Sequence, residues 1–213
     1  MEHSFWHSKW ESNQIGFHEP QGNALLLAHA STLLQPANPR VFVPLCGKSK
    51  DVGWLASKGC EVIGAELSAL AITQLFDELN ITPKVTELKH TTLYQGLNIT
   101  VFQGDIFSLS ANDIGNITGV YDRAALVALP QSLRERYSAH IRAITDNAPQ
   151  LLITFEYDQT QLPGPPFCVS ESMVSSLYND YYEIALLSAT TLEGGLKGKV
   201  DATNLAFHLI PRL

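Results

Sequence analysis

The stretch from Arg40 to Ser68 limits the fold of this chain more than any other part. Residues 41–43 are apolar β-formers that end at a proline and a turn, a pattern typical of a strand buried on both faces. An amphipathic helix of about ten residues is expected next, and Gly59 stands where a helix C-cap glycine belongs. A second strand over 61–64 leads to the acidic Glu66. The order strand, helix, strand predicts a parallel βαβ unit of the nucleotide-binding kind.

This unit places a turn and an acid side by side. A right-handed crossover brings the loop after the first strand next to the end of the second, at the carboxyl edge of the sheet. Gly47 and Glu66 are 19 positions apart, the spacing at which an acid meets a ribose, and a carboxylate accepts hydrogen bonds from both ribose hydroxyls. The spacing therefore predicts a ribose site, although a plain turn and a solvated strand end would use the same residues.

The turn also discriminates between nucleotides. A dinucleotide site needs the pattern G-x-G-x-x-G, and residues 45–49, Leu-Cys-Gly-Lys-Ser, supply only one glycine. A P-loop would need its first glycine at Phe42, which is a strand residue. Ribose chemistry without a phosphate cradle fits S-adenosylmethionine better than NAD or ATP.

Length, charge and cysteine content exclude several classes of protein. The 213 residues can bury one core, so we expect a single domain over 1–213, with a cap or lid segment at 1–34 and a sheet core at 40–213. A net charge of −7 argues against nucleic acid as a partner. Three cysteines without metal spacing indicate free thiols in a reducing compartment and no metal site. With neither a signal peptide nor a membrane-length apolar run, we expect a cytoplasmic protein that does not bind membranes.

Apolar periodicity predicts the remaining elements. Residues 1–23 are expected to be irregular, and residues 80–98 to form a polar, extended excursion. The result is an α/β fold, a doubly wound, mostly parallel sheet of seven strands with helices on both faces, which is the Rossmann-like arrangement of class I methyltransferases. The later strands are expected at 99–103, 119–122, 151–157, 181–187 and 205–210, and the other helices at 24–34, 69–79, 130–145 and 171–178.

The helical patterns also predict which side chains are buried. In the helix after the first strand, Val52 and Leu55 should face the core and Asp51 should face solvent. In the helix over 69–79, Leu70 is expected among the apolar set.

Residues after the third and fourth strands should stand over the same pocket. Asp105 and Ile106 can meet the edge and face of an adenine. The five donors of Arg123 can face an anionic substrate or a cofactor carboxylate, or its charge is used only in local pairing with Asp122. The lysines of the 193–199 loop are either on the substrate side or solvated.

Two tryptophans stand out near the N-terminus. Trp6 and Trp10 are four positions apart and share one face if a helix forms. They either fasten the N-terminus to the body or form a lid whose aromatic faces cover a cation such as a sulfonium.

Five motifs in order resemble the bacterial thiopurine S-methyltransferase family along nearly the full chain. The turn Pro-Leu-Cys-Gly-Lys is far more specific than a generic glycine-rich loop. Ala65 stands where the family usually has valine, which is a small change. The motifs are Trp6-x-x-x-Trp10 with Gly16-Phe17-His18, Val43 to Ser49, Gly64 to Ser68, Tyr121 to Leu126, and Gly164-Pro165-Pro166-Phe167.

The resemblance implies an S-adenosylmethionine-dependent methyltransferase that acts on aromatic and heterocyclic thiols such as thiopurines, and some bacterial members act on selenium or tellurium species. It implies a cofactor site that contains Arg123, the residue we expect to take part in catalysis, together with Trp10, Leu45 and Glu66, and with Asp105 and Ile106 beside the adenine. It implies an acceptor pocket shaped by Trp6, Phe17, Pro165 and Phe167, with His18 able to take a proton.

The expected reaction is an SN2 transfer to a thiolate, which leaves S-adenosylhomocysteine. A heterocyclic thiol ionises near neutral pH, so alignment and exclusion of water would supply most of the catalysis. The expected partner is a small-molecule thiol, and the chain is expected to be a monomer. Two rivals stay open: an NAD-dependent oxidoreductase, which the missing glycines disfavour, and a non-catalytic resistance protein that binds metalloids or thiols.

Overall fold

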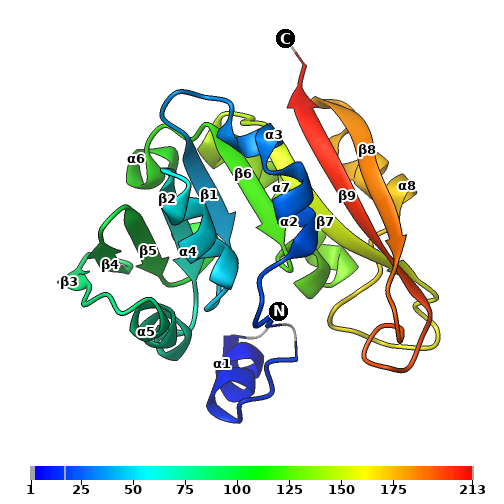
Figure 1. The fold of residues 1–213 in the computed structure, drawn as a ribbon, viewed down its shortest axis with the longest axis horizontal. Helices are drawn as coiled ribbons and strands as arrows, with labels where there is room; N and C mark the ends of the chain where they lie inside the picture. The colour runs from blue at the N-terminus through cyan, green and yellow to red at the C-terminus, as the bar shows by residue number, and fades with distance from the viewer. Residues whose placement is uncertain (1–2, 17, 213) are drawn as a thin grey trace.

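A single nine-stranded sheet forms the centre of the molecule (Figure 1). The computed structural model describes residues 3–16 and 18–212. The strand order is β3-β4-β5-β2-β1-β6-β7-β9-β8. Along the chain the elements are α1 (His3–Glu11), α2 (Ala24–His29), α3 (Ser31–Leu34), β1 (Arg40–Pro44), α4 (Lys50–Ser57), β2 (Glu61–Glu66), α5 (Ala69–Glu78), β3 (Lys84–Glu87), β4 (Thr92–Gly96), β5 (Ile99–Gln103), η1 (Ile106–Ser108), α6 (Ala111–Ile114), β6 (Gly119–Arg123), η2 (Leu126–Ala128), α7 (Gln131–Thr145), β7 (Gln150–Tyr157), α8 (Glu171–Tyr178), β8 (Tyr182–Thr191) and β9 (Ala202–Pro211).

The five central strands confirm the doubly wound, mostly parallel arrangement. From β1 the chain moves outward to β2 and β5, and then returns to the other side of β1 to form β6 and β7, all of them parallel. The winding therefore reverses between β1 and β6, which is where open α/β sheets form a crevice at the carboxyl ends of their strands. Helix α1 lies beyond this edge (Figure 1).

Helices cover both faces of the sheet, as the sequence predicted. Alternation along β1 sends Phe42 to one face and Val41 and Val43 to the other. The first face packs on α6, α7 and α8, and the second on α2, α3, α4 and α5. Within the described part of the chain, no helix has the length and apolar character needed to cross a membrane.

The prediction of seven strands is wrong, because residues 80–98 contain a hairpin. Strands β3 and β4 pair antiparallel and extend the sheet beyond β5, with Leu93 opposite Phe102 and Tyr94 opposite Val101. Leu93 and Tyr94 are only half-buried, because they pack on opposite faces of the sheet at the margins of its two cores. The sequence of the hairpin therefore lacks the apolar run that marks the central strands.

Two expectations about the first 34 residues also need correction. Residues 3–11 are not irregular but form α1, and the single helix expected at 24–34 is two, α2 and α3, which meet at Ala30. Helix α1 has a small apolar set, with Trp10 as its buried residue. Because periodicity is hard to see in such a short segment, the helix was missed.

Two predicted side-chain positions are also wrong. Asp51 is only 2% exposed, although a charged residue in an amphipathic helix was expected on the solvent side. It accepts hydrogen bonds from the N–H of Asn23 and the hydroxyl of Tyr121, which satisfy the buried carboxylate. Leu70 is 41% exposed, because it lies at the start of α5 outside the face that packs on the sheet.

Candidate active site

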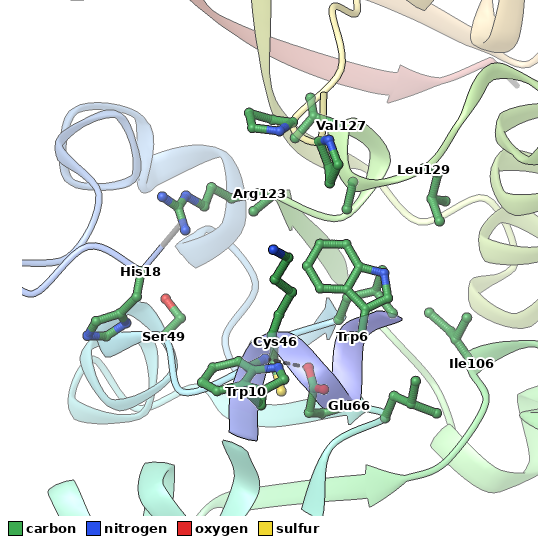
Figure 2. A pocket seen from close by; sticks show the side chains of 18 of the residues that line it. Trp6, Trp10, His18, Cys46, Ser49, Glu66, Ile106, Arg123, Val127 and Leu129 are labelled. Carbon is green, nitrogen blue, oxygen red and sulfur yellow. Dashed lines mark hydrogen bonds between the residues drawn. The ribbon is translucent and has the colours of Figure 1, made fainter. Parts of the chain in front are cut away.

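A cavity of about 820 Å³ opens at the carboxyl edge of the central strands (Figure 2). Its walls come from the turns after β1, β2, β5, β6 and β7, from α1 and from the 192–197 segment. Phe17, which was expected at the acceptor pocket, lies outside the described residues. Nine of the residues predicted for the site line the cavity: Trp6, Trp10, His18, Leu45, Glu66, Asp105, Ile106, Arg123 and Pro165.

The turn after β1 has an unusual backbone. Leu45 has a φ of +47° and Gly47 a φ of +54°, and the left-handed region is rare for leucine. The N–H of Cys46 donates to the carbonyl of Ala65 at 3.0 Å, which holds the turn against β2. Backbone strain of this kind is found at binding sites, where surrounding contacts maintain it.

Trp10 lies directly on this turn. A Cβ added to Gly47 would stand 3.0 Å from Cζ2 of Trp10, closer than side chains normally approach. Glycine at position 47 therefore allows both the positive φ and the approach of the indole. Cys46 beside it is 5% exposed, and burial raises the pKa of its thiol well above the usual range. This burial agrees with a packing role for Cys46 rather than a nucleophilic one.

Glu66 is the buried carboxylate of the cavity. Its side chain is 6% exposed; Oε2 accepts from the N–H of Gly47 at 2.9 Å and Oε1 from the N–H of Ser68 at 2.8 Å. Burial raises the pKa of Glu66, and the hydrogen bonds from Ser68 and Gly47 oppose that rise. Each oxygen has a second lone pair for a further donor. Glu66 is therefore not a solvated strand end but an oriented acceptor.

The end of β5 forms the neighbouring wall. The amide of Gln103 donates to the carbonyl of Leu67 at 3.1 Å and joins the ends of β5 and β2. Asp105 caps η1 by accepting from the N–H of Phe107 at 3.0 Å, and Ile106 is 6% exposed. This places an acid and a buried apolar side chain one strand away from Glu66.

Arg123 has a partner that the sequence did not reveal. Its Nη2 pairs with Oε1 of Glu19 at 2.5 Å, and its side chain is 11% exposed. The alternative of local pairing between Arg123 and Asp122 is wrong, because Asp122 is fully buried on the other face of β6 and accepts from the hydroxyl of Tyr137 at 2.7 Å. Burial raises the pKa of Asp122 to about 6.

His18 lies on the rim between Arg123 and the turn after β1. It lines the cavity and is half-buried. Burial and then the charge of Lys48 lower the pKa of His18. A lowered pKa favours the neutral imidazole at pH 7, and this form can accept a proton.

The opposite wall is aromatic and proline-rich. Trp6 packs edge to face against Phe5 at 5.2 Å between ring centroids, and both line the cavity. Pro165 joins them, and its carbonyl accepts a hydrogen bond from Nζ of Lys197 at 2.6 Å. Of the two options for the 193–199 lysines, the cavity side holds for Lys197.

Phe167 supports this wall from behind. A Cβ on Gly164 would lie 2.6 Å from Cδ1 of Phe167, and the Arg134 guanidinium stands 5.8 Å from the centre of the ring. Among the described residues, the cavity lining includes residues 164–166 of this loop and not Phe167. Its role in binding the acceptor stays a prediction, and the structure shows it in contact with the loop that lines the cavity.

Several lining residues could not be predicted from the sequence. Glu19 and Phe5 stand in the N-terminal segment, where no spacing marks a site. Tyr121 belongs to a strand that was recognised, but which way its side chain points could not be read from a short apolar run. Phe107 and Arg136, which stack at 4.0 Å from guanidinium to ring centre, come from η1 and α7. Nothing in the sequence brings these elements together.

Comparison with known proteins places this architecture in context. The family described as thiopurine S-methyltransferase matches residues 1–205. A thiopurine S-methyltransferase from Xanthobacter autotrophicus is 47% identical over 203 residues, which cover 95% of each chain. One from Pseudomonas aeruginosa is 39% identical over 217 aligned positions, which cover all of both chains.

Solved structures agree with the fold. An S-adenosylmethionine-dependent methyltransferase from Anabaena variabilis aligns with a TM-score of 0.69 at 14% identity, over 99% of this chain and 95% of that one. A Burkholderia thailandensis 1,6-didemethyltoxoflavin-N1-methyltransferase with bound S-adenosylhomocysteine gives 0.64 at 13%, over 98% and 87%.

Proposed function

Because this chain belongs to the thiopurine S-methyltransferase family, we propose that the cavity is its active site. The chain is an S-adenosylmethionine-dependent S-methyltransferase, and its acceptors are aromatic or heterocyclic thiols such as thiopurines. Selenium and tellurium compounds are a second acceptor class, since their nucleophilic atoms resemble sulfur.

The observation that carries the proposal is the contact between Glu66 and the turn after β1. A buried carboxylate stands at the end of β2 with both oxygens held by backbone N–H groups, and the turn that holds it is strained and contains a single glycine. This arrangement fits a ribose and offers no phosphate cradle. The residues present therefore fit S-adenosylmethionine better than a dinucleotide.

Each wall has a proposed role toward the cofactor. Glu66 accepts from the ribose hydroxyls, Leu45 packs at the turn, and Asp105 and Ile106 flank the adenine. Trp10 covers the turn from α1. When bound, S-adenosylmethionine supplies an electrophilic methyl group on a cationic sulfur. The aromatic face of a tryptophan is attractive to such a cation.

On the acceptor side, the protein's task is alignment and exclusion of water. Trp6 and Pro165 form an apolar wall that holds a flat ring and leaves little water around the reacting thiolate. Arg123 lies at the end of β6, between the cofactor and the acceptor, and its guanidinium takes part in catalysis by orienting the two reacting groups.

Among residues 3–16 and 18–212, two histidines line the cavity, His3 and His18. His3 lies beside Asp105 at the adenine end, which leaves His18 for the acceptor side. It takes up the thiol proton when the acceptor arrives un-ionised.

The proposal also covers the binding partners of the protein and its location in the cell. The substrate is a small molecule, which the dimensions of the cavity favour. A net charge of −7 supports the absence of nucleic acid among its partners. We propose a cytoplasmic location, since the three cysteines are free and suit a reducing compartment, and we propose that the chain acts as a monomer. The oxidoreductase and the non-catalytic binding protein have no support among the relatives described above.

The first test is calorimetric titration of the purified protein with S-adenosylhomocysteine, with NAD as the control ligand. We expect saturable binding of S-adenosylhomocysteine and none of NAD. Binding of NAD alone would overturn the proposal and restore the oxidoreductase.

A further inference from the structure

The guanidinium of Arg123 is already paired inside the cavity. Nη2 of Arg123 lies 2.5 Å from Oε1 of Glu19, and both residues line the cavity. The arginine side chain is 11% exposed and that of Glu19 39%, so water screens the pair only in part. A carboxylate this close cancels most of the attraction of the cation for a second anion. The cavity therefore presents a neutralised arginine at the end of β6.

Glu19 is held in place by Asn23. The side-chain amide of Asn23 donates from Nδ2 to Oε2 of Glu19 at 2.9 Å. The orientation of this amide is determined, because its Oδ1 accepts from the N–H groups of Leu25 and Leu26 as the N-cap of α2. Only Nδ2 of Asn23 is left to face Glu19. Because this nitrogen is a donor, its partner must be an acceptor such as a carboxylate oxygen.

Asn23 is tied in turn to α4 and back to β6. Its N–H donates to Oδ1 of Asp51 at 2.8 Å, and the hydroxyl of Tyr121 donates to Oδ2 at 2.9 Å. Tyr121 precedes Arg123 on the same strand. We call these five residues the Glu19 network: Glu19, Asn23, Asp51, Tyr121 and Arg123. It begins and ends on β6, at Arg123 and Tyr121, and Asn23, Asp51 and Tyr121 are buried.

The network stands across the cavity from the residues proposed to hold the ribose and the adenine. In the sheet, β1 separates β6 from β2 and β5, which carry Glu66 and the turn to Ile106. Figure 2 shows Arg123 across the cavity from Ile106. The strand beyond β6 is β7, whose following loop supplies Pro165 to the cavity. The paired charges therefore face the acceptor side.

We infer that Glu19 is a specificity-determining residue of the acceptor site. Its carboxylate neutralises Arg123, so that uncharged aromatic thiols are accepted in preference to thiols that carry a carboxylate. The inference rests on the function proposed above. A carboxylated thiol would bring its anion beside Glu19, where the arginine is already engaged, and discrimination of this kind uses repulsion against the wrong ligand. A neutral side chain at position 19 would release the guanidinium to donate to such a carboxylate.

The test compares acceptors that differ only in charge. The three positional isomers of mercaptobenzoate are each paired with the corresponding mercaptobenzamide, and kcat/KM is measured for the wild type, Glu19→Gln and Glu193→Gln. Glu193 is exposed and lies outside the cavity lining, so its variant is the matched control for net charge. In Glu19→Gln, the ratio of kcat/KM for the acid to kcat/KM for its amide should rise by at least about tenfold for at least one isomer. A factor of this size corresponds to one charge-assisted hydrogen bond. Glu193→Gln should keep the wild-type preference.

Two further measurements show that the gain acts through Arg123. In the double variant Glu19→Gln with Arg123→Gln, the rise in preference should disappear. Calorimetry with the unreactive methylthiobenzoates and their amides should show the same shift in binding without any turnover. The affinity of Glu19→Gln for S-adenosylhomocysteine should stay within about twofold of the wild type, since Glu19 stands on the acceptor side.

Two results would overturn the inference. One is an unchanged acid-to-amide preference in Glu19→Gln. The other is a large change in S-adenosylhomocysteine affinity, which would assign the pair to the cofactor tail instead. Failure of the proposed function looks different: the wild type itself would methylate none of the thiols, and the inference would fall with it.

Discussion

The backbone N–H of Gly47 donates a hydrogen bond of 2.9 Å to Oε2 of Glu66. This bond joins the turn after β1 to the end of β2, so the carboxylate and the turn form one rigid unit. The second oxygen is held by the N–H of Ser68. A diol that reaches Glu66 therefore meets acceptors that are already oriented, and this preorganisation lowers the entropy lost on binding.

Replacing Glu66 with alanine should weaken S-adenosylhomocysteine binding by about 30-fold, the equivalent of about 2 kcal/mol for hydrogen bonds to a charged group. Glu61→Gln is the matched control, because Glu61 lies at the opposite end of the same strand and pairs with Arg40. Calorimetric titration of both variants gives the comparison. Wild-type affinity in Glu66→Ala would remove this residue from the ribose role.

A methyl group at Gly47 should loosen the contact between Trp10 and the turn. Gly47 and Gly59 both have positive φ, +54° and +86°, but a Cβ meets Trp10 at 3.0 Å only at Gly47, and nothing within 4 Å at Gly59. Both alanine variants should lose about 1–2 kcal/mol of unfolding free energy in urea. Only Gly47→Ala should also lose affinity for S-adenosylhomocysteine. Equal affinities in the two variants would show that the approach of Trp10 does not matter for binding.

The buried Asp122 makes stability depend on pH. Burial raises its pKa from 3.8 to about 6, so the folded state holds the proton more tightly than the unfolded state does. The stability from this group is present below about pH 4 and is lost as pH rises through about 6, a change of about 3 kcal/mol. Asp122→Asn removes the titration but keeps the shape of the side chain.

Urea unfolding at several pH values compares this variant with the wild type. Between about pH 4 and about pH 7, the unfolding free energy of the wild type should fall by about 3 kcal/mol relative to that of Asp122→Asn. Parallel pH profiles would mean that Asp122 titrates alike in the folded and unfolded states.

Asp51 should be among the most sensitive acidic residues of the fold. Alanine at this position leaves the hydroxyl of Tyr121 and the N–H of Asn23 without their shared acceptor. Unpaired buried donors of this kind lower the unfolding free energy by about 3 kcal/mol in total. Asp77→Ala, an exposed change in α5, should stay within about 0.5 kcal/mol of the wild type. Similar losses in the two variants would show that the two hydrogen bonds add no stability.

The sequence predicted the parts of the fold that local patterns determine. The β1–α4–β2 unit follows from a short apolar run, a capping glycine and an acid, all within 29 residues. The rule that ligands bind at the carboxyl ends of parallel strands then located Asp105, Ile106 and Arg123 at the cavity, although they come from distant parts of the chain.

The contacts that could not be predicted join elements through side chains. Asp51 and Tyr121 are 70 positions apart, and a charged residue in a helix normally faces solvent, so nothing indicated this hydrogen bond. Glu19 has no spacing that relates it to Arg123. The β3–β4 hairpin was missed because half-exposed strands at the sheet margin lack a continuous apolar run.

Methyl transfer to sulfur is the most direct test of the proposed function. The purified protein is incubated with S-adenosylmethionine and thiophenol, and both products are quantified by mass spectrometry. We expect one S-adenosylhomocysteine for each S-methylated thiol, with turnover at limiting S-adenosylmethionine much reduced in Glu66→Ala. Binding of S-adenosylhomocysteine without a methylated product from any aromatic or heterocyclic thiol, thiopurines included, would contradict the proposed function.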